Sequence, residues 1–216
     1  MKTISPSILD VNNTKYTEYV NQLIEWGVTN VHYDVMDGKF VPNTALSFDT
    51  IKSIYENTKS HTMDIHLMVE NVEENINKFS AFSDIITFHF EAVNKKELEN
   101  IIQNYSKDVK LGIAINPDTD INNILQYIKH FELVLVMSVF PGKGGQSFIE
   151  NTLNKTKEIQ QYIIENNLNT IIQMDGGIND KTIQKTFENG TNLAVVGSYL
   201  VKNFSKNTIE DLLKNA

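Results

Sequence analysis

The sequence predicts an α/β protein with a (β/α)8 TIM-barrel fold, and three observations lead to this fold class. Short apolar runs alternate with longer amphipathic segments, the pattern of parallel strands separated by helices. Eight such strand–helix units follow one another along the 216 residues. No linker or composition break interrupts them, so we expect residues 1–216 to form a single domain. Eight units favour a closed barrel, with a doubly wound open sheet as the alternative.

The expected strands are short, mostly apolar runs that end at turn signals such as Asp37-Gly38 or Asn116-Pro117. They are Ile4–Leu9, Asn30–Met36, Thr62–Met68, Ile85–His89, Lys110–Ile115, Leu133–Val139, Thr170–Met174 and Asn192–Val196. The expected helices show helical spacing of apolar residues, and the first of them stops at Gly27. They are Thr14–Trp26, Phe48–Glu56, Val72–Phe82, Lys95–Tyr105, Ile121–Lys129, Ile149–Asn166 and Asp180–Glu188, with a last stretch after Gly197-Ser198.

The composition excludes several classes of protein. Hydrophobic residues make up 41% and charged residues 21%, which is ordinary for a globular domain. The net charge of −8 argues against general nucleic-acid binding. No apolar run approaches the ~20 residues of a membrane span, and no basic-then-apolar leader opens the chain. We therefore expect a cytoplasmic protein with neither nucleic acid nor a membrane as partner.

Two residue types are missing, and both absences restrict the chemistry. Without cysteine, neither disulfides nor thiolate ligands are available, so a metal must be bound by His, Asp, Glu or water. All 19 basic residues are lysines. An anionic ligand therefore meets no guanidinium fork, and must be bound by backbone N–H groups, a helix N-terminus or a lysine.

The second expected strand carries His32, Asp34 and Met36 at alternate positions, so these three side chains share one face. The third carries Asp64 and His66 in the same way. Functional residues of such barrels lie at the carboxyl ends of the strands.

A fourth candidate, Asp175, ends the seventh expected strand. Together, His32, Asp34, His66 and Asp175 predict a nitrogen and oxygen site for a divalent cation. The alternative is a set of core histidines satisfied by hydrogen bonds beside carboxylates that cap loops. His89, close to Glu91, is expected to make a structural hydrogen bond of that kind.

Glycine-bearing turns follow the last three expected strands and predict a phosphate site. They are Pro141-Gly142-Lys143-Gly144-Gly145-Gln146, Asp175-Gly176-Gly177-Ile178 and Gly197-Ser198. Glycine lets the backbone approach an anion closely, and the loops after strands seven and eight are a common phosphate site in these barrels. The alternative is that these glycines only make tight turns.

A series of short motifs runs along nearly the whole chain. They are Ser5-Pro6-Ser7-Ile8-Leu9, His32-Tyr33-Asp34-Val35-Met36-Asp37-Gly38, Phe40-Val41-Pro42-Asn43, Asp64-Ile65-His66-Leu67-Met68-Val69, Ile86-Thr87-Phe88-His89, Glu91-Ala92, Asn116-Pro117-Asp118-Thr119, Met137-Ser138-Val139 and the glycine turns above. In this order they resemble the ribulose-phosphate 3-epimerase family. The resemblance implies a (β/α)8 barrel, a homo-oligomer, and an isomerase that interconverts D-ribulose 5-phosphate and D-xylulose 5-phosphate. The implied chemistry is two-base proton transfer at C3 through a metal-stabilised enediolate.

The resemblance also implies roles for individual residues. One divalent metal per subunit, usually Zn²⁺ and otherwise Fe²⁺, Mn²⁺ or Co²⁺, is expected on His32, Asp34, His66 and Asp175. The two aspartates are the implied catalytic acid and base. The implied substrate contacts are Ser7, His66, Gly142, Gly144, Gly145, Asp175, Gly176, Gly177, Gly197 and Ser198.

Two positions depart from the family pattern. Lys143 stands where the family has an aromatic residue, and Lys39 where it has histidine. Lys143 could add a cation to the phosphate site, and on that hypothesis it joins the predicted substrate contacts. The alternative is that Lys143 only changes the packing of the loop or a substrate preference.

Three other functions are open at this point. The same site could epimerise a ketohexose 6-phosphate such as allulose 6-phosphate. A related barrel could decarboxylate or aldol-cleave its substrate, although such relatives carry an Asp-x-Lys-x-x-Asp motif where this chain has Asp64-Ile65-His66. A non-catalytic sugar-phosphate-binding protein is the third, and the presence of all four candidate ligands counts against it.

Overall fold

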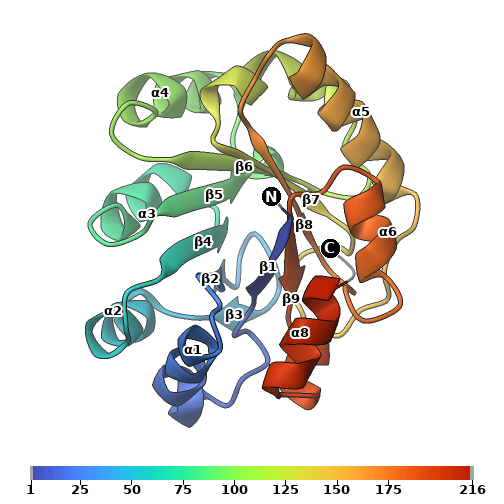
Figure 1. The fold of residues 1–216 in the computed structure, drawn as a ribbon. Helices are drawn as coiled ribbons and strands as arrows, with labels where there is room; N and C mark the ends of the chain where they lie inside the picture. The colour runs from blue at the N-terminus through green and yellow to red at the C-terminus, as the bar shows by residue number, and fades with distance from the viewer. Residues whose placement is uncertain (1, 215–216) are drawn as a thin grey trace.

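The computed structural model describes residues 2–214, and a ring of parallel strands lies at its centre (Figure 1). The strands are β1 (Thr3–Pro6), β2 (Asn30–Asp37), β3 (Thr44–Ala45), β4 (Thr62–Met68), β5 (Ile85–His89), β6 (Leu111–Ile115), β7 (Leu133–Met137), β8 (Ile171–Asp175) and β9 (Leu193–Val196). Their order in the sheet is β1-β9-β8-β7-β6-β5-β4-β2-β3. All neighbours are parallel except the short β3, which pairs antiparallel with β2.

The ring closes between β1 and β2 just past the last residue of β1. Ser7 forms a parallel bridge with His32, and the Ile8 N–H donates to the His32 carbonyl oxygen at 3.3 Å. The Ser7 N–H also donates to the Val196 carbonyl oxygen of β9 at 3.1 Å. The predicted (β/α)8 barrel is therefore confirmed, and its closing contact involves the strand that carries the predicted cluster.

Helices form an outer layer around the strands (Figure 1). The α-helices are α1 (Tyr16–Glu25), α2 (Phe48–Asn57), α3 (Val72–Phe79), α4 (Lys95–Tyr105), α5 (Thr152–Glu165), α6 (Ile183–Glu188), α7 (Ser198–Lys202) and α8 (Lys206–Lys214). Four 3₁₀ segments are η1 (Asn13–Lys15), η2 (Phe90–Ala92), η3 (Ile121–Asn123) and η4 (Leu125–His130). Side chains cap the starts of α2 and α4. Asn94, for example, accepts from the Glu97 N–H while the Glu97 side chain accepts from the Asn94 N–H, a capping box at the start of α4.

The two faces of each strand separate packing from chemistry. On β2, Val31, Tyr33 and Val35 point to the layer between strands and helices and join its apolar core. Burial of each such side chain contributes about 1.5–3 kcal/mol. The alternate residues His32 and Asp34 point into the barrel and are equally buried. The apolar face thus stabilises the strand while the inward face is free to carry polar residues.

One predicted helix is wrong in type. Residues 121–129 form the two 3₁₀ segments η3 and η4. Ile121, Ile124 and Ile128 are buried as their spacing suggests, but the Asp120 side chain accepts from the Asn122 N–H and favours a tight local turn. The hairpin strand β3 was not predicted, because a strand of two residues carries no periodic signal.

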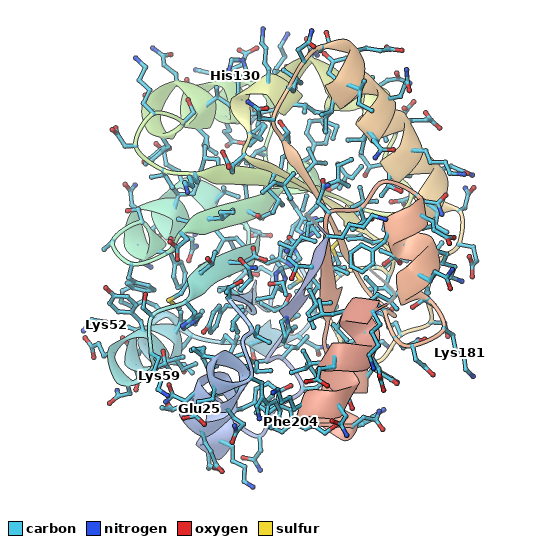
Figure 2. All side chains as sticks on the ribbon, in the orientation of Figure 1. Glu25, Lys52, Lys59, His130, Lys181 and Phe204 are labelled. Carbon is cyan, nitrogen blue, oxygen red and sulfur yellow. The ribbon has the colours of Figure 1, made fainter. Side chains whose placement is uncertain are left out.

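The outer surface is charged. Lysines such as Lys52, Lys59 and Lys181 project from the helical layer (Figure 2). Lys59 pairs with Glu25 of α1 at 2.9 Å, with both side chains more than half exposed. Such exposed pairs contribute little to stability, so the polar groups that matter most are those inside the barrel.

Candidate active site

The register between β2 and β4 brings histidines and aspartates together twice. His32 lies opposite Asp64, and Asp34 lies opposite His66. All four side chains point into the barrel and are at most 3% exposed. A shift of one residue would turn every one of these side chains to the helical layer, so the strand register itself builds the site.

The barrel closure adds Ser7 to this group. Its bridge to His32 places the Ser7 hydroxyl beside β2, where it donates to Asp34 Oδ2 at 2.7 Å. The other carboxylate oxygen, Asp34 Oδ1, lies 3.2 Å from His66 Nδ1 and 3.4 Å from His32 Nε2. Asp34 is thus fixed on one side by a hydroxyl and faces both imidazoles on the other.

The four predicted ligands converge on one point. His32 Nε2 lies 3.3 Å from His66 Nδ1, and Asp175 Oδ2, at the end of β8, lies 3.9 Å from both nitrogens. One donor atom from each of His32, Asp34, His66 and Asp175 falls within 4.8 Å of the others. Ligands about 2.0–2.1 Å from a tetrahedral zinc ion are about 3.3–3.4 Å apart. The donor set and its spacing therefore fit a small divalent cation.

Asp64 orients the first imidazole. Its Oδ2 lies 2.7 Å from His32 Nδ1, and the same oxygen accepts from the Gln173 side-chain amide. With Nδ1 donating to this carboxylate, His32 presents a bare Nε2 to the cluster. Carboxylates behind metal-binding histidines commonly play this part.

The pKa values of the two carboxyl groups in the cluster are shifted in opposite directions. Burial raises the pKa of Asp34, but the neighbouring imidazoles of His32 and His66 outweigh it and hold that pKa below its ordinary value. Burial and then the charge on Asp34 raise the pKa of Asp175 to about 7. Burial also disfavours a charged His32, but Asp64 and Asp34 outweigh it and hold the pKa of His32 well above its ordinary value. In the absence of a metal, protons are the positive charge that balances these carboxylates.

A pocket opens directly beside the cluster at the carboxyl ends of the strands. The predicted site residues on its wall are Ser7, Asp34, Gly142, Lys143, Gly144, Gly145, Asp175, Gly176, Gly177, Gly197 and Ser198. Met36, Met68 and Met137 form an apolar part of the same wall. His32 and His66 are fully buried beneath it. The structure thus brings the predicted substrate contacts and the predicted metal ligands together.

At two positions on the pocket wall, the backbone conformation requires glycine. Gly176 and Gly177 have positive φ angles of 121° and 64°, which residues with a side chain rarely adopt. A Cβ on Gly176 would lie 2.4 Å from Val139 Cγ2, and one on Gly177 would lie 2.6 Å from the Phe148 backbone nitrogen. This segment can therefore make a tight turn, and its backbone can approach a ligand closely.

The two lysines that depart from the family pattern lie in different places. Lys143 is exposed on the pocket wall. Lys39 is exposed in the turn after β2, where its N–H donates to Asp37 Oδ1 at 2.8 Å, and it is not on that wall. Lys143 is therefore the one in a position to affect a bound anion.

Several residues of the site were not predicted. Asp10 and Gln146 also line the pocket. Gln146 Nε2 donates to the carbonyl oxygens of Phe140 and Lys143 at 2.7 and 2.9 Å and so holds the glycine loop in shape. A Cβ on Gly144 would lie 2.3 Å from Asp10 Oδ2, so this loop lies against the Asp10 side chain in the segment after β1. The position of Asp10 just after the first strand was the available signal.

Solved structures of other proteins share this fold. The chain superposes on 3-hexulose-6-phosphate synthase from Salmonella typhimurium with a TM-score of 0.71, covering 100% of this chain and 98% of the other at 13% identity. It superposes on the tryptophan synthase α-subunit from Pyrococcus furiosus with a TM-score of 0.70, covering 99% and 97% at 15% identity. At these identities the likeness shows the barrel fold alone. In residues 2–214, no helix has the length and apolar character needed to cross a membrane.

Sequence relatives are more specific. The chain is 35% identical to ribulose-phosphate 3-epimerase of Methanocaldococcus jannaschii over 215 residues, covering 100% of this chain and 89% of that protein. It is 36% identical to the chloroplastic ribulose-5-phosphate 3-epimerase of Arabidopsis thaliana over 197 residues, covering 90% and 70%. The model of the ribulose-phosphate 3-epimerase family matches residues 3–201. This chain is therefore an isomerase that belongs to the ribulose-phosphate 3-epimerase family.

Proposed function

We propose that this protein interconverts D-ribulose 5-phosphate and D-xylulose 5-phosphate by inverting C3, with Asp34 and Asp175 as the two bases. The observation that carries the proposal is the placement of these carboxylates. They come from β2 and β8, strands separated by β1 and β9, yet both line the pocket and both reach the His32–His66 pair. Carboxylates from separated strands can address the two faces of one substrate.

Inversion at C3 requires removal of a proton from one face and its return to the other. The C3 proton is acidic because it lies beside the C2 carbonyl. One aspartate accepts it, and the other donates a proton to the opposite face; in the reverse direction the roles exchange. The pKa of Asp175 is raised to about 7 while that of Asp34 is lowered. In the metal-free site, Asp175 is therefore the carboxyl that holds a proton more readily.

The Ser7 hydroxyl holds Asp34 in place through its 2.7 Å hydrogen bond to Oδ2. We propose that Ser7, and by the family resemblance His66, also contact the substrate. A divalent cation on His32, Asp34, His66 and Asp175 would supply positive charge that stabilises the negative charge developing on the substrate as the C3 proton leaves. The nitrogen and oxygen donors suit Zn²⁺ first, with Fe²⁺, Mn²⁺ and Co²⁺ as alternatives.

The glycine-bearing loops account for the phosphate end of the substrate. Because the chain has no arginine, we propose that the phosphate is bound by the backbone of the 142–145, 176–177 and 197–198 segments, with Lys143 adding charge at the rim. A homo-oligomeric state is part of the same proposal and rests on the family resemblance. A cytoplasmic location is also proposed, from the sequence pattern alone.

Turnover of purified protein with D-ribulose 5-phosphate tests the proposal, with allulose 6-phosphate at equal concentration as the comparison. We expect the pentulose phosphate to turn over faster than the hexulose phosphate. When the reaction is run in D₂O, we expect deuterium at C3 of the product. Preference for the hexulose would keep the mechanism and change the substrate. No turnover of either, in protein shown to hold metal, would contradict the proposed function.

A further inference from the structure

Behind His66, two polar side chains, His89 and Glu91, form a line that leads away from the cluster. His66 Nε2 lies 2.9 Å from His89 Nε2, and His89 Nδ1 lies 3.2 Å from Glu91 Oε2. Both imidazoles are fully buried, and the Glu91 side chain is 23% exposed. The His66 and His89 rings stack with their centroids 5.0 Å apart. The centroids of the Phe40 and His89 rings are 4.9 Å apart. This arrangement holds His89 in one orientation.

The protons along this line can be placed by counting donors and acceptors. His66 Nδ1 is the nitrogen that faces Asp34 and Asp175, so it must be bare to bind a cation. His66 then carries its proton on Nε2 and donates it to His89 Nε2. A neutral His89 must in turn carry its proton on Nδ1, where Glu91 Oε2 accepts it. A carboxylate at the far end is the partner that this order requires.

Glu91 is itself held from a second loop. Its Oε1 accepts from the Asn116 backbone N–H at 2.8 Å and from the Thr119 hydroxyl. Burial raises the pKa of Glu91, but its hydrogen bonds with His89, Asn116 and Thr119 outweigh burial and hold that pKa below its ordinary value. The loop after β6 therefore keeps an ionised carboxylate aimed at His89.

We propose that Glu91, acting through His89, is a positioning residue of the metal site. It fixes the tautomer of His66 that leaves Nδ1 bare, and it raises the basicity of that nitrogen. This inference rests on the proposed function, because it requires that the four-residue cluster binds a divalent cation. Outer carboxylates of this kind typically change metal affinity 10–100-fold.

Zinc affinity, measured by competition with a chromophoric chelator, tests the proposal in Glu91→Gln and Glu91→Ala. We expect zinc to bind at least about tenfold more weakly in both, and most weakly in Glu91→Ala, where His89 Nδ1 loses its acceptor. One control variant should bind zinc like the unaltered protein. Glu99→Gln removes the same charge from an exposed site on α4. Thr119→Val removes one of the hydrogen bonds that hold Glu91 but leaves the contact of Glu91 with His89, so zinc affinity should fall less than in Glu91→Gln.

Nitrogen NMR of the zinc-loaded protein supplies a readout that a purely structural role would not affect. We expect the His66 proton on Nε2 and the His89 proton on Nδ1, with the His89 signal shifted in Glu91→Ala. Thermal unfolding of the metal-free forms checks that each variant folds.

The outcomes separate this inference from the proposed function. If the unaltered protein binds no zinc, manganese or iron at the cluster, the metal site and the inference both fail. If the unaltered protein binds zinc but folded Glu91 variants match Glu99→Gln, only the inference fails. A His89 proton on Nε2 would also overturn it, because His66 Nε2 would then be the acceptor.

Discussion

The two halves of the active site are built in different ways. The His–Asp cluster consists of buried side chains on β2, β4 and β8, which the strand register holds in place. The proposed phosphate half consists of glycine-bearing loops, which contribute six glycines to the pocket wall. Side chains on strands can be directed to within a fraction of an ångström, as catalysis requires, whereas backbone loops can surround an anion without any arginine. The comparison teaches that substitutions should change turnover in the first half and substrate affinity in the second.

The largest effect is expected in the cluster. Asp34→Asn and Asp175→Asn each remove a proposed base that is also a proposed cation ligand, so kcat should fall by at least about a thousandfold. Each variant should still unfold cooperatively, because the amide fills the same space. The kcat of each, measured at saturating metal and substrate, is the readout. Substantial activity in either variant would contradict the two-base mechanism.

Gly197→Ala should affect the other half without disturbing the fold. A Cβ there would meet nothing closer than Ser7 Cβ at 3.6 Å, an ordinary contact, but it would protrude from the wall of the proposed phosphate pocket. We expect KM for the phosphorylated ketose to rise about tenfold with little change in kcat, the cost of about one lost polar contact. The melting temperature is the control. An unchanged KM would mean that the phosphate lies elsewhere.

The pH dependence of zinc affinity should reveal the proton that Asp175 holds in the metal-free cluster. Asp175 has a pKa raised to about 7, so below that pH it holds a proton that zinc must displace. Zinc affinity should therefore fall by an additional factor of up to about ten per pH unit below 7, beyond the loss caused by protonated His32. Competition titrations across this range measure the slope. Asp175→Asn should show a shallower slope, and an equal slope would contradict this assignment.

The smallest effect is expected at the rim. Lys143→Ala removes an exposed cation from the pocket wall, and we expect KM to rise only a few-fold, with kcat unchanged and the difference shrinking in added salt. Lys107→Ala, an exposed lysine that is not on the pocket wall, is the matched control. If both variants have the KM of the unaltered protein, Lys143 is not a phosphate contact.

The predictability of the structure follows the same division. The strands were predicted to within a few residues, because apolar runs bounded by turn signals leave little freedom. The shared face of His32, Asp34 and Met36 follows from the period of two alone. The opposition of His32 to Asp64 and of Asp34 to His66 does not, because it depends on the register between two strands. Sequence spacing thus identified the residues but not their pairing.

The features that were missed depend on contacts between distant loops. Glu91 is bound by Asn116 and Thr119, which lie after the next strand, and no spacing in the sequence relates these residues to His66. The contact of His89 with Glu91 was predicted as a structural hydrogen bond and is present. The contact of the other His89 nitrogen, Nε2, with His66 could not be predicted without knowing how β4 packs against β5.

Metal removal and reconstitution test the central claim most directly. Turnover of D-ribulose 5-phosphate should be measured before chelation, after verified removal of metal, and after addition of Zn²⁺, Fe²⁺, Mn²⁺ or Co²⁺. We predict that activity is lost with the metal and returns with about one bound ion per chain, and that Asp175→Asn is not restored by the same treatment. Full activity in protein shown to be free of metal would contradict the account of His32, Asp34, His66 and Asp175 as a catalytic metal site.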